Sequence, residues 1–260
     1  MKKIISLILV SLMLLSLLTS CGVEKSDLKA VENAGKLVVG VTVYQPMDYL
    51  DENGEWTGFD AELAKQFAET LGVNCQLVII NWNNKVAELD SKQIDLIWNG
   101  MTASDELGQK IDFSVSYAKN AQVAVVKKGS SLTADDVKNA KIAVENGSAG
   151  ATVAAETIQG TNINKVTAMV DALSEVLAGT SDVAVIDITM AQSVVGKGAY
   201  ADLEILEGAS YGDEIFAVGL RKGSDLKTKL DDFLKAKYAD GTLTALAEKY
   251  TVGLNTDALK

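Results

Sequence analysis

Two series of alternating strand and helix patterns constrain the fold of this 260-residue chain more than any other feature. In the first series, the predicted strands are residues 36–43, 75–81 and 94–98, which are rich in β-branched and other apolar side chains. The amphipathic segments 58–72 and 84–90 lie between them and are predicted helices. Because a strand–helix–strand order favours parallel pairing with right-handed crossovers, we expect an α/β sheet flanked by helices.

A second series begins at residue 121 and predicts a second α/β lobe. Its predicted strands are residues 121–128, 141–145, 164–167 and 182–187, and its predicted helices are residues 151–158, 169–177 and 188–195. A further strand at 214–220 and two helices at 226–239 and 243–250 follow. A chain of this length can bury substantial cores, and it suits two lobes better than one.

The first 20 residues have the pattern of a secretory signal peptide. Two lysines follow Met1, and residues 4–18 form an apolar run too short for a typical membrane-spanning helix. The sequence Leu18-Thr19-Ser20-Cys21 resembles the bacterial lipoprotein box, which implies cleavage before Cys21 and a lipid on that cysteine. The alternative is an ordinary signal peptide with an incidental cysteine. Lipid chains on Cys21 would anchor the protein outside the cytoplasm on the cell membrane, with residues 21–35 as a tether.

Charge and composition exclude several functional classes. Acidic residues outnumber basic residues by 35 to 24, which argues against a nucleic-acid partner. The chain has no histidine, which excludes histidine-dependent triads and most zinc sites. Cys75 has no intramolecular partner once Cys21 is lipidated, so we interpret it as a small buried apolar residue. Neither a metal nor a cofactor is expected.

The segment 95–114 is the most informative motif in the chain. It contains Asp95, Asn99-Gly100-Met101-Thr102 and Asp112-Phe113-Ser114. This pattern resembles the ligand-binding signature of the extracytoplasmic solute-binding proteins of family 3, which serve ABC importers of amino acids. Four weaker matches occur in the same order as in that family: Gly54-x-x-x-Gly58-Phe59-Asp60, Gly147-Ser148, Asp182–Asp187, and Leu220–Gly223 with Asp240–Thr242.

The resemblance implies an α/β, two-lobed fold like that of the type II periplasmic binding proteins. Each lobe is expected to have a mostly parallel sheet flanked by helices, and two crossover strands would form a hinge that lets the lobes close on a ligand. Lobe 1 is expected at residues 36–122 and 218–260, and lobe 2 at residues 123–217. The resemblance also implies the function, which is capture of a small polar solute, an amino acid or related amine, by a monomeric lipoprotein. The solute would then pass to an ABC permease in the membrane.

One position departs from the family pattern. The family's signature has an arginine that clamps the α-carboxylate of the bound amino acid, and this chain has Leu107 there. An arginine offers carboxylate a bidentate fork of donors, which leucine cannot replace. Two readings follow and stay open. Either weaker donors such as Thr102, Ser104, Ser148 and the backbone at 147–149 bind a carboxylate, or the ligand has no α-carboxylate, as in an amine.

Two aspartates are candidates for binding the ligand's ammonium group. By resemblance, Asp187 faces the cleft at the end of a lobe-2 strand; the alternative is that it caps the helix that begins at Ile188. Asp48 follows the first strand and is either a second cation partner or a solvated turn residue. If both face a cleft without arginine, the site is negative and should prefer a cationic group.

Aromatic side chains at strand ends often form one wall of a small-molecule site, or pack in the core. Tyr49 and Trp82 are the aromatic residues that we assign to the cleft. The complete set of predicted ligand-binding residues is Asp48, Tyr49, Trp82, Asn99, Gly100, Met101, Thr102, Ser148, Ala149 and Asp187.

Two other functions are alternatives to a transport receptor. Some proteins of this fold family are dehydratases that act on cyclic acids, but the lack of histidine and the lipoprotein box argue against an enzyme. A sensory ligand-binding domain would normally continue into a membrane span, whereas this sequence ends at Lys260.

Overall fold

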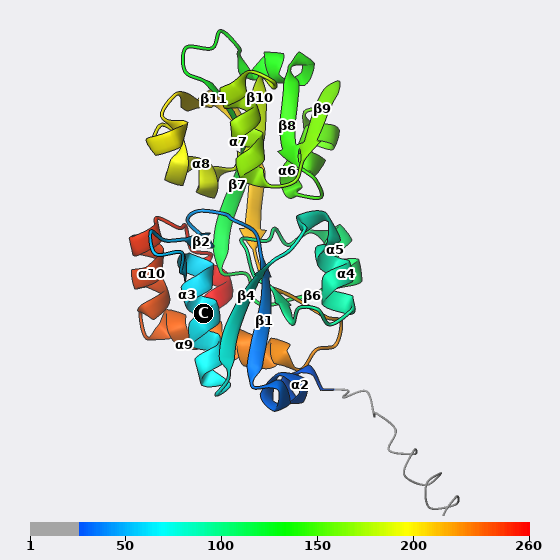
Figure 1. The fold of residues 1–260 in the computed structure, drawn as a ribbon, viewed down its shortest axis with the longest axis vertical. Helices are drawn as coiled ribbons and strands as arrows, with labels where there is room; N and C mark the ends of the chain where they lie inside the picture. Colours follow the sequence, from blue (N-terminus) through cyan, green and yellow to red (C-terminus); the bar gives the residue numbers. More distant parts are fainter. Residues whose placement is uncertain (1–25) are drawn as a thin grey trace, which may run out of the picture.

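A computed structural model describes residues 26–260 as two α/β lobes, one above the other in Figure 1. Each lobe is built on a five-stranded sheet. The predicted signal peptide at 1–20 and the predicted lipid on Cys21 lie outside the described residues. No helix among residues 26–260 has both the length and the apolar character needed to cross a membrane.

Lobe 1 has the strand order β4-β1-β5-β12-β6. These strands are β1 (Lys36–Val41), β4 (Asn74–Ile79), β5 (Leu96–Ile97), β6 (Asp112–Phe113) and β12 (Gly219–Leu220). The strand β1 pairs in parallel with β4 and β5, while β12 is antiparallel to β5 and β6. A separate hairpin is formed by β2 (Tyr49–Leu50) and β3 (Trp56–Thr57).

Helices cover both faces of the lobe-1 sheet (Figure 1). They are α2 (Asp27–Ala34), α3 (Phe59–Thr70), α4 (Lys85–Asp90), α5 (Asp105–Lys110), α9 (Leu226–Ala239), α10 (Thr242–Tyr250) and α11 (Thr256–Leu259). Leu37, Val39 and Val41 alternate along β1 and pack with Phe67 and other apolar residues on the face covered by α3, α9 and α10. Val38 points the other way and packs on the α4 side.

Lobe 2 has the strand order β11-β7-β10-β8-β9. These strands are β7 (Ala118–Lys127), β8 (Lys141–Glu145), β9 (Asn162–Val166), β10 (Val183–Asp187) and β11 (Leu203–Phe216). The helices are α6 (Ala149–Thr152), which continues as a π-helix over Val153–Thr157, α7 (Met169–Ala178) and α8 (Ile188–Val194), with short 3₁₀ helices at Ala134–Asn139 and Gly198–Tyr200.

Both sheets are mixed, and each is mostly parallel as expected, because only β12 in lobe 1 and β7 in lobe 2 run against the other strands of their sheet. In lobe 2, β10, β8 and β9 are parallel, but β7 is antiparallel to both β10 and β11. The physical reason is the path of the chain. β7 leaves lobe 1 and β11 returns to it, so the two connecting strands run in opposite directions, side by side, in Figure 1. Their ladder begins at the pair Ala118–Phe216, near the predicted crossings between the lobes.

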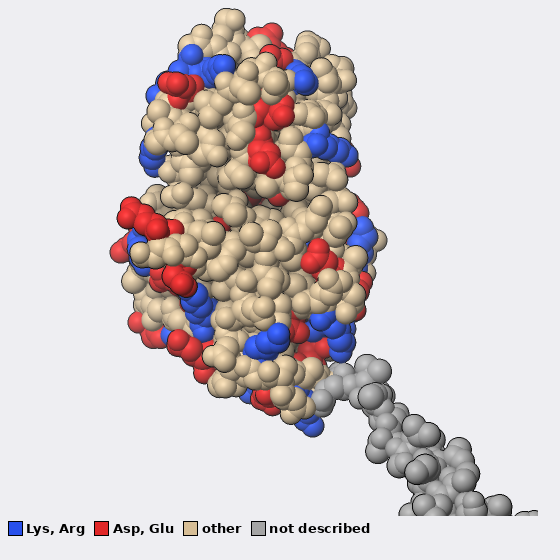
Figure 2. Space-filling model, viewed as in Figure 1, with Lys and Arg blue, Asp and Glu red and all other residues tan. Residues whose placement is uncertain are grey.

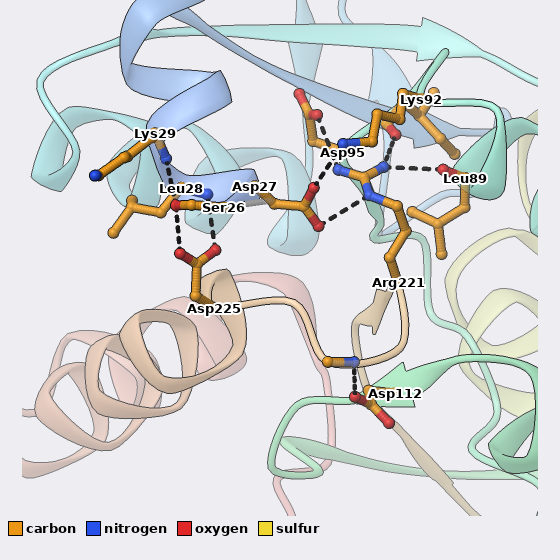
Figure 3. Close-up of polar contacts among 12 residues, drawn as sticks. Ser26, Asp27, Leu28, Lys29, Leu89, Lys92, Asp95, Asp112, Arg221 and Asp225 are labelled. Atoms are coloured by element: carbon orange, nitrogen blue, oxygen red, sulfur yellow. Dashed lines mark hydrogen bonds and ion pairs between the residues drawn. The ribbon is translucent and has the colours of Figure 1, made fainter. Parts of the chain in front are cut away.

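A buried arginine fastens the returning chain to lobe 1 (Figure 3). Arg221 follows β12 and is 9% exposed. Its Nε donates to Asp27 Oδ2 at 2.9 Å, and its Nη1 donates to the carbonyl oxygens of Leu89 at 2.9 Å and Ile94 at 2.7 Å. Its Nη2 lies 3.3 Å from Asp95 Oδ1. The Arg221 side chain therefore joins its own segment to two others that are far away in the sequence, at Asp27 and at residues 89–95.

Part of the predicted tether is a structural part of lobe 1. Ser26 caps α2 by accepting from the backbone N–H of Lys29, and its hydroxyl donates to Asp225 at 2.5 Å (Figure 3). The backbone N–H of Leu28 donates to the same carboxylate. Val31 is buried in the lobe-1 core. The ordered chain thus extends well into the predicted tether at residues 21–35.

Candidate ligand-binding site

The candidate site lies at the boundary of the two lobes, where Figure 2 shows a groove across the waist of the molecule. Strand ends of both lobes meet there: the chain after β1 and β5 in lobe 1, and the chain after β8 and β10 in lobe 2. In open α/β sheets, ligands bind beyond the carboxyl ends of strands.

Asp187 lies at the end of β10 and is 5% exposed. Its Oδ1 accepts hydrogen bonds from Asn120 Nδ2 at 2.6 Å and from Gln122 Nε2 at 2.5 Å. The same two amides donate to Glu214 Oε2 at 2.8 and 2.9 Å. Strand pairing explains this arrangement, because Asp187 is opposite Gln122 and Glu214 is opposite Asn120 in the sheet.

The side chain of Asp187 does not cap α8, which was the alternative role. Asp187 occupies the position before α8, yet it makes no capping hydrogen bond. Asn120 instead accepts from the backbone N–H and the hydroxyl of Thr189 in the first turn, at 3.4 and 3.1 Å. The Asp187 carboxylate is therefore available to another group.

Asp187, Glu145 and Glu214 form an acidic cluster in which no carboxylate makes an ion pair with the described part of the chain, and Lys85 acts on Glu145 only from beyond 4.0 Å. Burial, followed by the charge of Glu214, raises the pKa of Asp187 to about 7. Burial, followed by the charge of Asp187, raises the pKa of Glu145 to about 8, and Glu145 Oε1 has no hydrogen-bond partner. No lysine or arginine nitrogen in residues 26–260 lies within 4.0 Å of these carboxylates. A bound cation would relieve this desolvated negative charge.

Tyr44, rather than Tyr49, is the tyrosine beside the acidic cluster. Tyr44 is 2% exposed, and its ring meets that of Phe216 edge-on with centroids 6.4 Å apart. Burial, followed by the charge of Asp187 and a hydrogen bond with it, raises the pKa of Tyr44 well above its usual value, so the Tyr44 hydroxyl faces the Asp187 carboxylate. Tyr49 is half-buried in the β2–β3 hairpin and lines a separate hollow of about 710 Å³ with Thr189 and Tyr250.

Asp48 and Asn99 lie in the interior of lobe 1. Asp48 is fully buried and its Oδ2 accepts from Asn99 Nδ2 at 2.7 Å, while Asn99 Oδ1 accepts from the backbone and hydroxyl of Thr42. Burial, followed by the charge of Asp60, raises the pKa of Asp48 well above its usual value. Asp60 is fully buried within α3 and accepts from Gly100 N at 2.7 Å. These residues hold the loop after β5 in place.

The next three predicted residues shape the lobe-1 side of the boundary. Gly100 has φ +55°, and a Cβ there would lie 2.7 Å from the Tyr44 ring, so only glycine lets the tyrosine pack so closely. Met101 is buried in the apolar cluster on the α4 side. The Thr102 hydroxyl donates to Glu214 Oε2 at 2.9 Å and so links lobe 1 to the acidic cluster.

Ser148 and Ala149 lie at the start of α6 in lobe 2. The Ser148 hydroxyl donates to the carbonyl oxygen of Glu145 at 2.8 Å and accepts from Ala151 N at 3.1 Å. Its hydrogen bonds therefore serve to cap the helix. Ala149 is half-buried. Gly147, directly before them, has φ +75° and approaches lobe 1.

Trp82 lies on the opposite side of the boundary, in a 3₁₀ turn over Trp82–Asn84 that leads into α4. It is 7% exposed and packs in the same cluster as Met101 and Leu107. The Nζ of Lys85 lies 4.8 Å from the centroid of the Trp82 ring. That nitrogen also donates to the carbonyl oxygen of Gly147 at 2.8 Å, across the boundary between the lobes.

Sequence analysis missed Lys85, Glu145, Glu214, Asn120 and Gln122. Two of them carried a usable signal, because Asn120 and Gln122 are polar residues at alternate positions of an otherwise apolar strand, which places both on one face of the sheet. The other three lie close to the site only because of contacts between distant parts of the chain.

The chain is similar over most of its length to proteins that bind amino acids. The family model described as bacterial extracellular solute-binding proteins, family 3, matches residues 37–253. The L-cystine-binding protein TcyJ of Escherichia coli (strain K12) is 33% identical over 232 residues, which are 87% of this chain and 86% of TcyJ.

Two solved structures extend the similarity to the fold. One is a substrate-binding protein of an ABC uptake transporter from Streptococcus pneumoniae with bound histidine, with TM-score 0.80 and 29% identity over 87% of this chain and 96% of that one. The other is an ancestral amino acid-binding protein described as a precursor of cyclohexadienyl dehydratase, with TM-score 0.79 and 30% identity over 86% and 99%. The predicted type II fold is confirmed, and this chain belongs to the bacterial extracellular solute-binding proteins of family 3, as a binding protein for a small polar solute.

Proposed function

We propose that this protein is the receptor of an ABC importer and that it binds an amino acid or a related amine between its two lobes. The observation that carries this proposal is the acidic cluster at the lobe boundary, in which Asp187 and Glu145 are buried, Glu214 is half-buried, and no carboxylate makes an ion pair with the described residues. An ammonium group placed beside Asp187 would find a carboxylate and, next to it, the hydroxyl of Tyr44. Relatives named for binding cystine and histidine take ligands with such a group.

A panel of L-amino acids and amines, tested by thermal shift on residues 21–260, examines this proposal. A ligand that binds only the folded protein stabilises it by about 2.7 kcal/mol at 100 times its dissociation constant. For a protein of this size, that is a rise in melting temperature of about 5 °C or more. A protein that is stabilised by none of these compounds is not such a receptor.

Membrane attachment is part of the same proposal. Cys21 would carry the lipid, and five residues later Ser26 is fastened to lobe 1 by Asp225. The receptor would then stay within reach of its permease. Metabolic labelling with an alkyne fatty acid tests this assignment: the wild-type chain should carry label in the membrane fraction. Cys21→Ser should abolish both labelling and attachment, and a labelled, membrane-bound variant would contradict it.

A dehydratase-like enzyme is the second candidate, favoured by the similarity to the ancestral precursor of a dehydratase. A carboxyl group with a pKa near 8, such as Glu145, could donate a proton at neutral pH. Incubation with small cyclic acids, followed by product analysis, distinguishes the two. We expect binding or no interaction, and catalytic turnover would replace the receptor assignment.

A further inference from the structure

Lys85 is a buried cation at the lobe boundary that forms no ion pair within 4.0 Å among the described residues, although the charge of Glu145 acts on it from farther away. It is the first residue of α4 and is 5% exposed. Its Nζ donates to the carbonyl oxygens of Trp82 at 3.2 Å and Gly147 at 2.8 Å. Within residues 26–260, no carboxylate oxygen lies within 4.0 Å of this nitrogen.

Burial is costly for an ammonium group and lowers the pKa of Lys85 to about 8, because the charge of Glu145 offsets only part of the burial effect. Contact with two carbonyl oxygens does not require a charge, because a neutral amide donor would serve as well. An ammonium also has three N–H groups, and the two carbonyl oxygens use two of them. One donor and the positive charge are left for an anion.

The contacts of Lys85 lead directly to the acidic cluster. Gly147, which accepts from Lys85, begins the turn into α6. Three residues later, the position of a Cβ on Gly150 would be 3.0 Å from Gln122 Oε1, and Gln122 Nε2 donates to Asp187 at 2.5 Å. Lys85 and Asp187 are therefore joined by one short row of residues along the lobe boundary.

Electrostatics connect the same groups. Glu145 interacts with the charges of both Lys85 and Asp187, so the three groups lie near one another at the lobe boundary. Gln122 Oε1 and Glu145 Oε1 along this row are buried and have no hydrogen-bond partner. Unpartnered acceptors near two opposite charges suit a small molecule that carries N–H donors and both charges.

We propose that Lys85 receives the α-carboxylate of a bound amino acid while Asp187 receives its ammonium group, so that the ligand is a zwitterion and not an amine. This inference rests on the proposed function and decides between the two ligand classes that Leu107 leaves open. Leu107 packs in the cluster beneath Trp82 and carries no charge, and Lys85 supplies a cation on the same side of the boundary.

The test compares each amino acid with the amine that lacks its carboxylate: L-histidine with histamine, L-arginine with agmatine, and L-cystine with cystamine. Dissociation constants are measured by calorimetry for wild type, Lys85→Met, Lys85→Arg and Lys110→Met. Lys110 is an exposed lysine that pairs with Glu106 on neighbouring α5, so its loss controls for net charge.

For whichever amino acid binds wild type, Lys85→Met should weaken affinity about 30-fold or more, the equivalent of about 2 kcal/mol for a buried charge pair. Lys85→Arg should retain binding within about tenfold, and Lys110→Met should leave it unchanged. The paired amine, if it binds, should change by less than about threefold in Lys85→Met. Methionine keeps the apolar stem and removes the charge, so the melting temperature of the variant should not fall.

If Lys85→Met weakens the affinity for an amino acid and for its amine equally, Lys85 only links the two lobes and the inference is overturned. The inference is also overturned if the affinity for the amino acid does not change. Wild type that binds amines but no amino acid overturns the inference and leaves a binding function. Wild type that binds none of the six compounds and none of the wider panel refutes the proposed function and the inference with it.

The pH dependence supplies a second readout. A lysine with a pKa of about 8 loses its charge above that pH, so amino-acid affinity of wild type should fall up to tenfold per unit between about pH 8.5 and 10. Lys85→Arg keeps its charge throughout this range. Because titration of the ligand is the same for both proteins, coinciding pH profiles would contradict the assignment.

Discussion

Replacement of Asp187 by asparagine should weaken ligand binding and stabilise the free protein at the same time. Asparagine keeps the size of the side chain, and its carbonyl oxygen can still accept from Asn120 and Gln122. What it removes is a desolvated negative charge beside Glu214. A residue that served only the fold would show the opposite effect on stability.

The size of the stability effect follows from the raised pKa. Below about pH 4, Asp187 is protonated in both the folded and the unfolded chain and contributes no penalty. Between about pH 4 and 7 the unfolded chain releases the proton while the folded chain keeps it, so stability falls as pH rises. A pKa of about 7 instead of 3.8 corresponds to a penalty on the order of 4 kcal/mol above pH 7.

Thermal unfolding of wild type and Asp187→Asn at pH 4 and at pH 7.5 measures this difference. The variant should melt at least about 5 °C higher at pH 7.5, given about 2–4 °C per kcal/mol in proteins of this size, and should match wild type at pH 4. A lower melting temperature at pH 7.5 would refute the view of Asp187 as an unpaired charge.

Ligand binding should respond in the other direction. Loss of one partner of a buried charge pair costs about 2–5 kcal/mol, which is a weakening of about 30-fold or more. Because a bound ammonium favours the ionised carboxylate, the affinity of wild type should also rise from pH 5 to about 7 and then level, and this rise should be reduced in the variant. Unchanged affinity for a ligand identified by calorimetry would remove Asp187 from the site.

Three further outcomes are expected. Arg221→Met should lower the free energy of unfolding by about 3–5 kcal/mol in chemical denaturation, because buried Asp27 keeps only the more exposed Lys92 as a partner and Asp95 loses its ion pair, whereas Lys222→Met on the surface should cost at most about 1 kcal/mol. Gly147→Ala should weaken ligand binding more than the control Gly179→Ala. Both glycines have φ +75°, but only a Cβ at Gly147 would lie 2.9 Å from an Asn83 atom in the opposite lobe. Equal effects of the two substitutions on binding would refute this contact. Cys75 should resist maleimide at pH 8 until the protein unfolds, since burial raises its pKa to about 12.

The fold was predictable because periodicity and family motifs agree over most of the chain. The parallel strands of both lobes and the return of the chain to lobe 1 follow from these signals. The exception is β11, which begins at Leu203, although only residues from 214 onward have a strand pattern. Gly208 and Gly212 interrupt the earlier part, where the pairing with β7 shifts register at two irregularities. A strand interrupted in this way has no alternating pattern to detect.

A residue of the candidate site could be predicted only where the end of one strand was enough to fix its position. Asp187 lies beside the lobe boundary as expected, since its position depends on the end of β10 alone. Asp48 follows a strand end in the same way, yet it points into lobe 1 and bonds to Asn99, because the loop around Pro46 turns back on itself through the Tyr44–Asp48 bridge. Side-chain direction in a loop depends on such contacts, which sequence patterns do not encode.

Lys85 and the acidic cluster have opposite perturbations with one physical origin. Burial lowers the pKa of the lysine to about 8 and raises the pKa of Asp187 to about 7, so each group is held in surroundings that oppose its charge. An amine beside Asp187 would relieve only the negative end and leave Lys85 unpaired. A zwitterion would relieve both ends at once, and the energy recovered at Lys85 would add to its affinity. At neutral pH, the groups whose burial destabilises the free protein are therefore the ones that a bound amino acid can pair. This makes an amino acid bind more tightly than its amine, although position 107 has no arginine.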